Sequence, residues 1–129
     1  MSESRQEVIR NLFETWNEGD REAGLGVSHE DSVLHSAITN STFRGHEGIR
    51  QWMAEIDEQF DAWRLELQEI RELEDGRLLA LGRVRAHGRA SGLELDQPIG
   101  WLIEFRGEKL AETWFYMGHD EALRAAGLA

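Results

Sequence analysis

The sequence predicts an α+β fold in which helical segments come first and a run of strands follows. In the first half of the chain apolar residues recur with helical spacing, and in the second half they alternate in long stretches that short turns separate. Helices followed by consecutive strands are typical of a layered α+β arrangement. At 129 residues and without cysteine, the chain can bury a core without disulfides, so we expect one domain over residues 1–129.

Three helices are predicted in the first half of the chain. The first covers residues 4–17, because its apolar residues fall on one helix face: Val8, Ile9, Leu12, Phe13 and Trp16. The second starts at Asp20 and is short, since Gly24 and Gly26 each cost up to about 1 kcal/mol inside a helix. The third opens within residues 43–53. Its buried side carries Ile49, Trp52, Met53 and Ile56.

A short strand over residues 32–38 and a polar connection over residues 39–42 lie between the second and third helices. Long strands follow the third helix, over residues 63–73, 77–91, 93–106 and 110–117. The Asp75-Gly76 pair is typical of a tight hairpin between the first two. Pro98 lacks an N–H donor and therefore indicates a sheet edge or a bulge. A short closing helix is predicted over residues 120–127.

The strand over residues 77–91 has two unlike faces, because successive side chains of a strand point to opposite sides of a sheet. One face carries Leu79, Leu81, Arg83, Arg85, His87 and Arg89, and the other carries Ala80, Gly82, Val84, Ala86 and Gly88. The small side chains of the second face let a helix or another backbone approach closely. The cations of the first face need water, carboxylates or an anionic ligand around them.

The charge of the chain excludes two classes of partner. Acidic residues number 25 against 14 basic ones, and the formal net charge of −11 repels a nucleic-acid backbone and an anionic membrane surface. No apolar stretch approaches the roughly 20 residues of a membrane-spanning helix. The N-terminal residues lack the basic start and apolar centre of a targeting segment. We therefore expect a soluble, cytoplasmic protein.

Two groups of residues are candidates for acid–base catalysis. Arg83, Arg85, His87 and Arg89 could line a pocket for an anionic or carbonyl-bearing ligand, with His87 as an acid or base near neutral pH. The alternative is an exposed, ion-paired sheet face. Its carboxylates would come from neighbouring strands, at Asp96, Glu94, Glu104 and Glu112. His35 on the short strand is the second candidate, and its alternative is a buried, hydrogen-bonded structural histidine.

The aromatic residues are candidates for a ligand pocket. Five tryptophans and one tyrosine could either fill the core or line a cavity for a flat, apolar ligand. The ones expected to face the cavity are Trp16, Trp101, Trp114 and Tyr116. The five histidines show no close metal-ligand spacing, such as two histidines four positions apart on a helix, so neither a metal site nor a cofactor is predicted.

Five motifs lie at residues 16–20 (Trp-Asn-Glu-Gly-Asp), 43–50 (Phe-Arg-Gly-His-Glu-Gly-Ile-Arg), 88–92, 105–109 and 116–128. In this order and spacing they resemble the SnoaL-like branch of the nuclear transport factor 2-like superfamily, which includes ketosteroid isomerases, scytalone dehydratase and limonene epoxide hydrolase. The resemblance implies a cone-shaped, curved sheet, mixed or antiparallel, wrapped around the three helices as in a cystatin-like α+β barrel. It also implies a pocket between the concave face and the helices, and a homodimer packed through the sheet.

The catalytic groups of that family are mostly missing from this chain. When the sequences are aligned on the Gly-Asp pair after the first helix, the corresponding positions hold Leu12 and Ser36 (ketosteroid isomerases), Arg85 and Phe115 (limonene epoxide hydrolases), and Gly118 (polyketide cyclases). The resemblance therefore disfavours steroid isomerisation by that mechanism. For the cyclases, His119 and Asp120 lie next to Gly118 in a shifted register, so cyclase chemistry stays an alternative.

Three functions fit these observations. The first is a SnoaL-like enzyme for acid–base chemistry on a hydrophobic carbonyl compound, such as isomerisation, cyclisation, dehydration or hydrolysis. Its catalytic candidates are His35, His87, Arg83 and Arg85. The second is a non-catalytic protein that binds a hydrophobic small molecule in an aromatic-walled cavity. The third is a dimeric interaction domain whose interior is filled.

Overall fold

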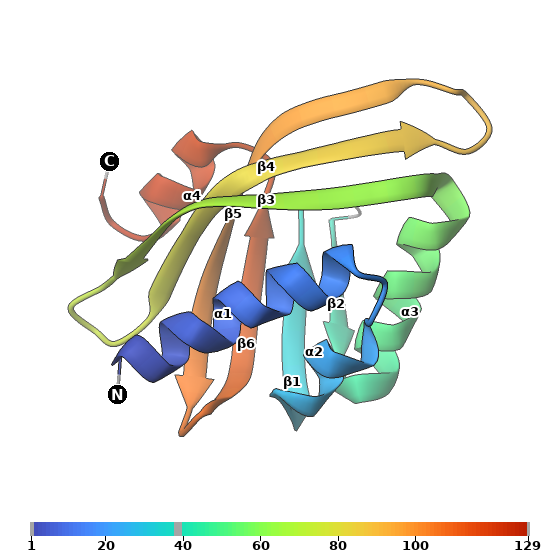
Figure 1. Cartoon of the computed structure of the whole chain (residues 1–129). Helices are drawn as coiled ribbons and strands as arrows, with labels where there is room; N and C mark the ends of the chain where they lie inside the picture. The colour runs from blue at the N-terminus through green and yellow to red at the C-terminus, as the bar shows by residue number, and fades with distance from the viewer. Residues whose placement is uncertain (1, 38–39, 129) are drawn as a thin grey trace.

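The computed structural model describes residues 2–37 and 40–128 and has the predicted α+β architecture. Its elements are α1 (Ser2–Asn17), α2 (Glu22–Gly26), β1 (Ser28–Ser36), β2 (Ser41–Arg44), α3 (Gly45–Gln59), β3 (Phe60–Glu72), β4 (Leu78–Gly88), β5 (Glu94–Arg106), β6 (Lys109–Tyr116) and α4 (His119–Ala125). The strands form one sheet in the order β2-β1-β6-β5-β4-β3 (Figure 1). Only β1 and β6 pair in parallel; the other neighbours are antiparallel.

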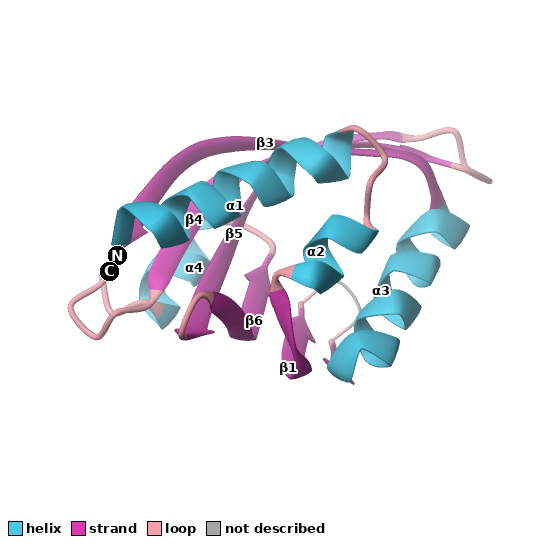
Figure 2. Cartoon of the chain, turned by 60° about the horizontal axis from the view of Figure 1, so that its bottom comes forward, coloured by secondary structure: helices cyan, strands magenta, loops and turns pink. Residues whose placement is uncertain are grey.

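The sheet is curved, and its concave face encloses α1, α2 and α3 (Figure 2). The main hydrophobic core lies between this face and the helices. The convex face carries a smaller cluster of Leu79, Leu81, Leu102 and Ala122, through which α4 packs. A Cβ atom on Gly100 would lie 2.4 Å from Cβ of Ala122, so glycine at this position lets α4 sit close to the sheet. These features give the cone that the family resemblance implied.

The curvature has a local origin where β3 and β4 pair. The pairing register shifts between Leu67 and Glu69, which marks a bulge in β3. Gly82 of β4 faces this bulge, and a Cβ atom there would lie 2.1 Å from the carbonyl oxygen of Glu66. The small-residue face of this strand therefore does permit the close backbone approach that the sequence indicated.

Two elements differ from the sequence prediction. The first strand begins at Ser28 rather than at residue 32, and residues 41–44 form the additional strand β2 instead of a connection and a helix start. Pairing explains both, because Phe43 is buried opposite Leu34 while the other residues of β2 are exposed. A four-residue strand with one buried side chain carries almost no alternation in its sequence. Ile38, the last residue of the predicted strand, lies outside the described residues.

Pro98 lies at the kind of position that the sequence indicated. It pairs with Arg83 on β4, whereas the pairing of β5 with β6 starts only at Gly100. At Pro98 the strand β5 therefore has a neighbour on one side only, which makes it locally an edge. Within the part of the chain that the structure describes, no helix has the length and apolar character needed to cross a membrane.

Candidate functional site

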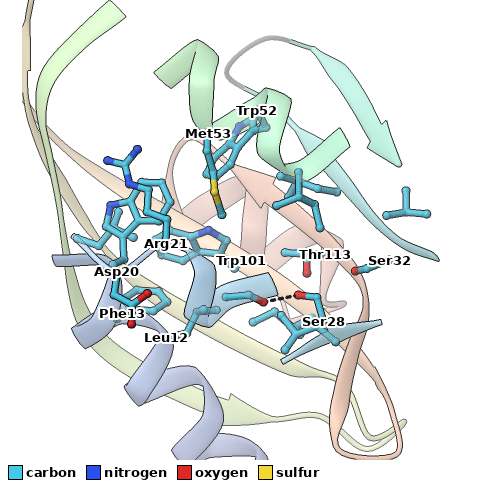
Figure 3. Close-up of a pocket in the computed structure, with 18 residues that line it drawn as sticks. Leu12, Phe13, Asp20, Arg21, Ser28, Ser32, Trp52, Met53, Trp101 and Thr113 are labelled. Atoms are coloured by element: carbon cyan, nitrogen blue, oxygen red, sulfur yellow. Dashed lines mark hydrogen bonds between the residues drawn. The ribbon is translucent and has the colours of Figure 1, made fainter. Parts of the chain in front are cut away.

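A pocket lies between the concave face and the three helices (Figure 3). Its volume is about 110 Å³. The lining side chains come from α1, α2, α3 and four strands: Leu12, Phe13, Trp16, Asp20, Arg21, Gly24, Ser28, Ser32, Val33, Leu34, Ile49, Trp52, Met53, Leu65, Trp101, Ile103, Leu110 and Thr113. Most of them are apolar or aromatic, which is the composition of a small-molecule site.

Stacked aromatic rings fix the shape of the pocket wall. Trp101 lies between two phenylalanines, with Phe13 edge-on at a centroid distance of 4.7 Å and Phe115 stacked at 5.1 Å. Trp16 and Trp52 approach each other at 5.7 Å from α1 and α3. Such contacts contribute stability beyond the buried area, and they limit the rotamers of the wall residues.

The charged groups of the pocket lie at its α2 end, next to Trp16. The indole N–H of Trp16 donates to the carbonyl of Trp63 at 2.9 Å, which holds the ring in place. Arg21 stacks over this ring at 4.1 Å and forms an ion pair with Asp57 of α3. Asp20 accepts a hydrogen bond from the backbone N–H of Ala23 at the start of α2. Both charged residues of the lining are therefore engaged by other protein groups.

Hydroxyl groups mark the opposite end, along the wall that β1 and β6 form (Figure 3). Ser28 donates to the carbonyl of Gly24 at 2.8 Å. The hydroxyls of Ser32 and Thr113 have no hydrogen-bond partner among the described residues, and Figure 3 shows both side chains at this end of the pocket. Ser32 is 3% exposed. The pocket thus has a charged end, an aromatic middle and a neutral polar end.

Two of the four predicted pocket aromatics line this pocket, and two do not. Trp16 and Trp101 are part of its wall. Trp101 pairs directly with Phe115 across β5 and β6, so Phe115 shares its face and Trp114 and Tyr116 point to the convex side. Burial raises the pKa of the Tyr116 hydroxyl above its usual value.

The predicted catalytic cations also lie on the convex face, away from the pocket, with the side chains that alternate with the buried Val84. The structure has the ion-paired surface that the sequence left as the alternative. The contacts are Arg83 to Asp96 at 2.9 Å, Arg85 to Asp96 and to Glu66 at 3.8 Å each, and His87 to Asp61 at 2.7 Å. Asp96 is the partner that the sequence named, whereas Glu66 and Asp61 were not foreseen.

His35 lies on the convex face too, beside a second, more open hollow of about 260 Å³. Its Nε2 is 2.6 Å from a carboxylate oxygen of Glu112, and its Nδ1 is 3.2 Å from the hydroxyl of Thr42. The ring stacks on Trp114, with centroids 5.4 Å apart. His35 therefore has the hydrogen bonds expected of a structural histidine, which was the alternative to a catalytic one. Its side chain is only partly buried, however.

The sequence did not identify Arg21, Ser32 or Thr113 as pocket residues. Ser32 and Thr113 could have been found, because each is a hydroxyl residue that shares a strand face with a buried apolar residue two positions later. Arg21 lies in the turn before a five-residue helix, where no periodicity indicates its direction. Among residues 2–37 and 40–128, no group of three or more histidine and acidic side chains could hold a metal ion.

Comparison with known proteins decides the family. The family model of the SnoaL-like domain matches residues 9–113, which is most of the chain. The chain belongs to the SnoaL-like family. The matched segment runs from α1 to β6 and includes every lining residue of the pocket described above. A search of curated proteins found no match.

Solved structures share this SnoaL-like fold at low sequence identity. An NTF2-like protein of unknown function from Burkholderia pseudomallei has a TM-score of 0.81 and 16% identity, over 95% of this chain and 97% of that one. A protein with a ketosteroid isomerase-like fold from Catenulispora acidiphila, solved in complex with trimethylamine, has a TM-score of 0.78 and 18% identity, over 95% and 94%. A protein provisionally named a SnoaL-like polyketide cyclase, from Jannaschia, has a TM-score of 0.78 and 17% identity, over 98% and 92%.

Proposed function

We propose that this protein binds a small, largely apolar molecule in the pocket between its helices and its concave sheet. The composition of the pocket wall carries the proposal: aromatic and aliphatic side chains dominate it, and none of the described histidines takes part. An apolar hollow with few polar groups favours binding over acid–base chemistry. The relative from Catenulispora acidiphila, crystallised with trimethylamine, supports a small molecule as the ligand class.

A pocket-filling variant tests this proposal. Ile49 lines the pocket, so Ile49→Trp should occupy the space and abolish binding of ring-sized neutral compounds. Binding is measured by NMR shifts of the five tryptophan indole N–H signals in the wild-type chain. Leu93→Trp is the matched control, because Leu93 is 72% exposed and lies outside the pocket. If Ile49→Trp fails to fold, Met53→Trp replaces it. Equal binding by filled and control variants would contradict the proposal.

Acid–base catalysis on the convex face is a second candidate function. The observation that favours it is the 2.6 Å contact between His35 and Glu112 beside an open hollow, since a carboxylate that holds an imidazole in one orientation is a recurring feature of general bases. Some proteins with the same fold are named polyketide cyclases, and this likeness supports catalysis only at the level of the fold.

A model ester separates this second candidate from simple binding. If His35 is a general base, hydrolysis of p-nitrophenyl acetate should fall by about 10²-fold in His35→Gln. His29→Gln is the control, because the Nε2 of His29 donates to the backbone carbonyl of Arg106 at 2.8 Å. The same rate in both variants would remove His35 from the catalytic candidates.

We also retain the homodimer through the sheet and the cytoplasmic location as predictions. The family resemblance supports the dimer, and the convex face around Arg85 and Asp96 would be its surface, because paired opposite charges can match a second copy across a two-fold axis. Light scattering should give twice the chain mass of 14.8 kDa. A monomer mass that persists at high concentration would contradict the dimer.

A further inference from the structure

The neutral polar end of the pocket holds two hydroxyls that the protein itself leaves unpaired. Ser28 is satisfied by the carbonyl of Gly24, but neither Ser32 nor Thr113 has a partner among the described residues. Ser32 is 3% exposed, and Figure 3 shows it together with Thr113 at the β1–β6 side of the pocket. An unpaired hydroxyl at a pocket wall keeps both its donor and its acceptor capacity for a bound molecule. A ligand oxygen at this end would complete these hydrogen bonds.

The same end of the pocket disfavours an ionic ligand. Within the described lining the charged residues are Asp20 and Arg21, and Figure 3 places both across the aromatic middle from Thr113. Asp20 is used as a cap for α2, and Arg21 is held by Asp57 and Trp16. A charge buried beside Ser32 and Thr113 would have hydroxyl partners but no counter-ion, which is costly in apolar surroundings.

The volume of the pocket limits the ligand to about one small ring. An apolar cavity of about 150 Å³ holds benzene, and this pocket measures about 110 Å³. The aromatic middle, with Trp101 and Phe13 in edge-to-face contact, offers flat apolar surface to such a ring.

We propose that the ligand is a neutral alcohol or ketone built on one small ring, and that Ser32 and Thr113 bind its oxygen. A serine or threonine hydroxyl both donates and accepts, so the pair can serve a ligand hydroxyl as well as a carbonyl. This inference rests on the proposed function, because it names the chemistry of a ligand in the same pocket. It adds a polar subsite that orients the ligand with its ring toward Trp101 and its oxygen toward β1 and β6.

The test compares two probes of matched shape, cyclopentanol and methylcyclopentane, in the wild-type chain and in two nearly isosteric variants. Ser32→Ala and Thr113→Val should each weaken cyclopentanol binding about fivefold to tenfold, which corresponds to one hydrogen bond. Methylcyclopentane binding should stay the same or become tighter, since its methyl group forms no hydrogen bond with the two hydroxyls. NMR titration of the indole N–H signals reports both affinities, and thermal unfolding checks that each variant folds. Ser91→Ala, in the exposed hairpin turn, is the control.

Several outcomes would overturn the inference. If the two hydroxyl variants weaken both probes by the same factor, the hydroxyls shape the pocket and do not bind the ligand oxygen. If cyclopentanecarboxylate or cyclopentylammonium binds the wild-type chain as tightly as cyclopentanol, the ligand class is ionic and the neutral subsite is wrong. Methylcyclopentane that binds while cyclopentanol does not would overturn the subsite and leave the proposed function intact. If none of the four probes binds, the proposed function itself fails.

Discussion

Trp101 of β5 and Phe115 of β6 face each other directly across the two strands, and their rings stack with planes 9° apart. Trp101 lines the pocket, whereas Phe115 lies behind it and is 1% exposed. Phe13 closes the other side of Trp101 edge-on. This part of the pocket wall is therefore a core residue held between two other core residues, so the stability of the fold and the shape of the pocket depend on the same contacts.

Phe115→Ala should lower the free energy of unfolding by about 3–5 kcal/mol, because it removes a fully buried ring and leaves a cavity behind Trp101. Urea unfolding measures this change. The variant should also bind ring-sized ligands more weakly, since Trp101 loses its stacking partner. Leu93→Ala, at an exposed position, should stay within about 0.5 kcal/mol of the wild-type chain. A similar loss in both variants would contradict the role given to Phe115.

Gly82→Ala should destabilise the chain by about 1–3 kcal/mol, because its Cβ would lie 2.1 Å from a backbone oxygen that cannot move without disturbing the bulge in β3. Gly26→Ala is the matched control, since nothing lies within 4 Å of its added Cβ. The control should leave the free energy of unfolding unchanged or raise it by up to about 1 kcal/mol through helix propensity. Equal effects at the two glycines would show that the curvature does not depend on Gly82.

Tyr116 should titrate above its ordinary pKa of 10.0, because burial disfavours the charged phenolate. It is the single tyrosine of the chain, so ultraviolet absorbance of the phenolate reports it without overlap. Since the folded pKa lies above the unfolded one, this group's contribution to stability is complete below about pH 10 and is lost as the pH rises through the folded pKa. Tyr116→Phe should remove that loss. A midpoint at or below that of the urea-unfolded chain would contradict the prediction.

Asp57→Asn should release Arg21 at the charged end of the pocket and let ligands exchange faster. Association and dissociation rates should rise together by up to about fivefold, with little change in the dissociation constant, because a partly exposed ion pair contributes about 0–1 kcal/mol. Stopped-flow tryptophan fluorescence measures both rates. Glu58→Gln removes the same charge one residue away and should leave the rates unchanged. If the two variants behave alike, the pair does not control access.

Sequence periodicity was sufficient for the larger part of the fold. Helix α1, helix α3 and the strands β3 to β6 each carry many apolar residues in a clear period, so their existence and order follow from the sequence. Strand β2 does not, because a single buried residue, Phe43, fixes it against Leu34. The parallel pairing of β1 with β6 joins residues far apart in the chain, and no local pattern encodes such a partner.

The candidate site was predicted in part, and the reason lies in how strands present two faces. Alternation correctly puts Trp114 and Tyr116 on one face and Phe115 on the other, but it does not say which face is concave. Only the register that sets Trp101 opposite Phe115 decides this. The same ambiguity applied to the strand with Arg83, whose small-residue face turned out to cover the core.

The parallel pairing of β1 with β6 also constrains the time at which this pocket can form during translation. Thr113 belongs to β6, whereas its neighbour in the sheet, Leu34, belongs to β1, so translation makes the two strands at widely separated times. A nascent chain that has emerged only as far as β5 carries all three helices of the pocket but lacks one wall. Such non-local closure is slow compared with helix formation. The cavity therefore closes only after β6 has been made, and a ligand present earlier in synthesis would find one wall missing.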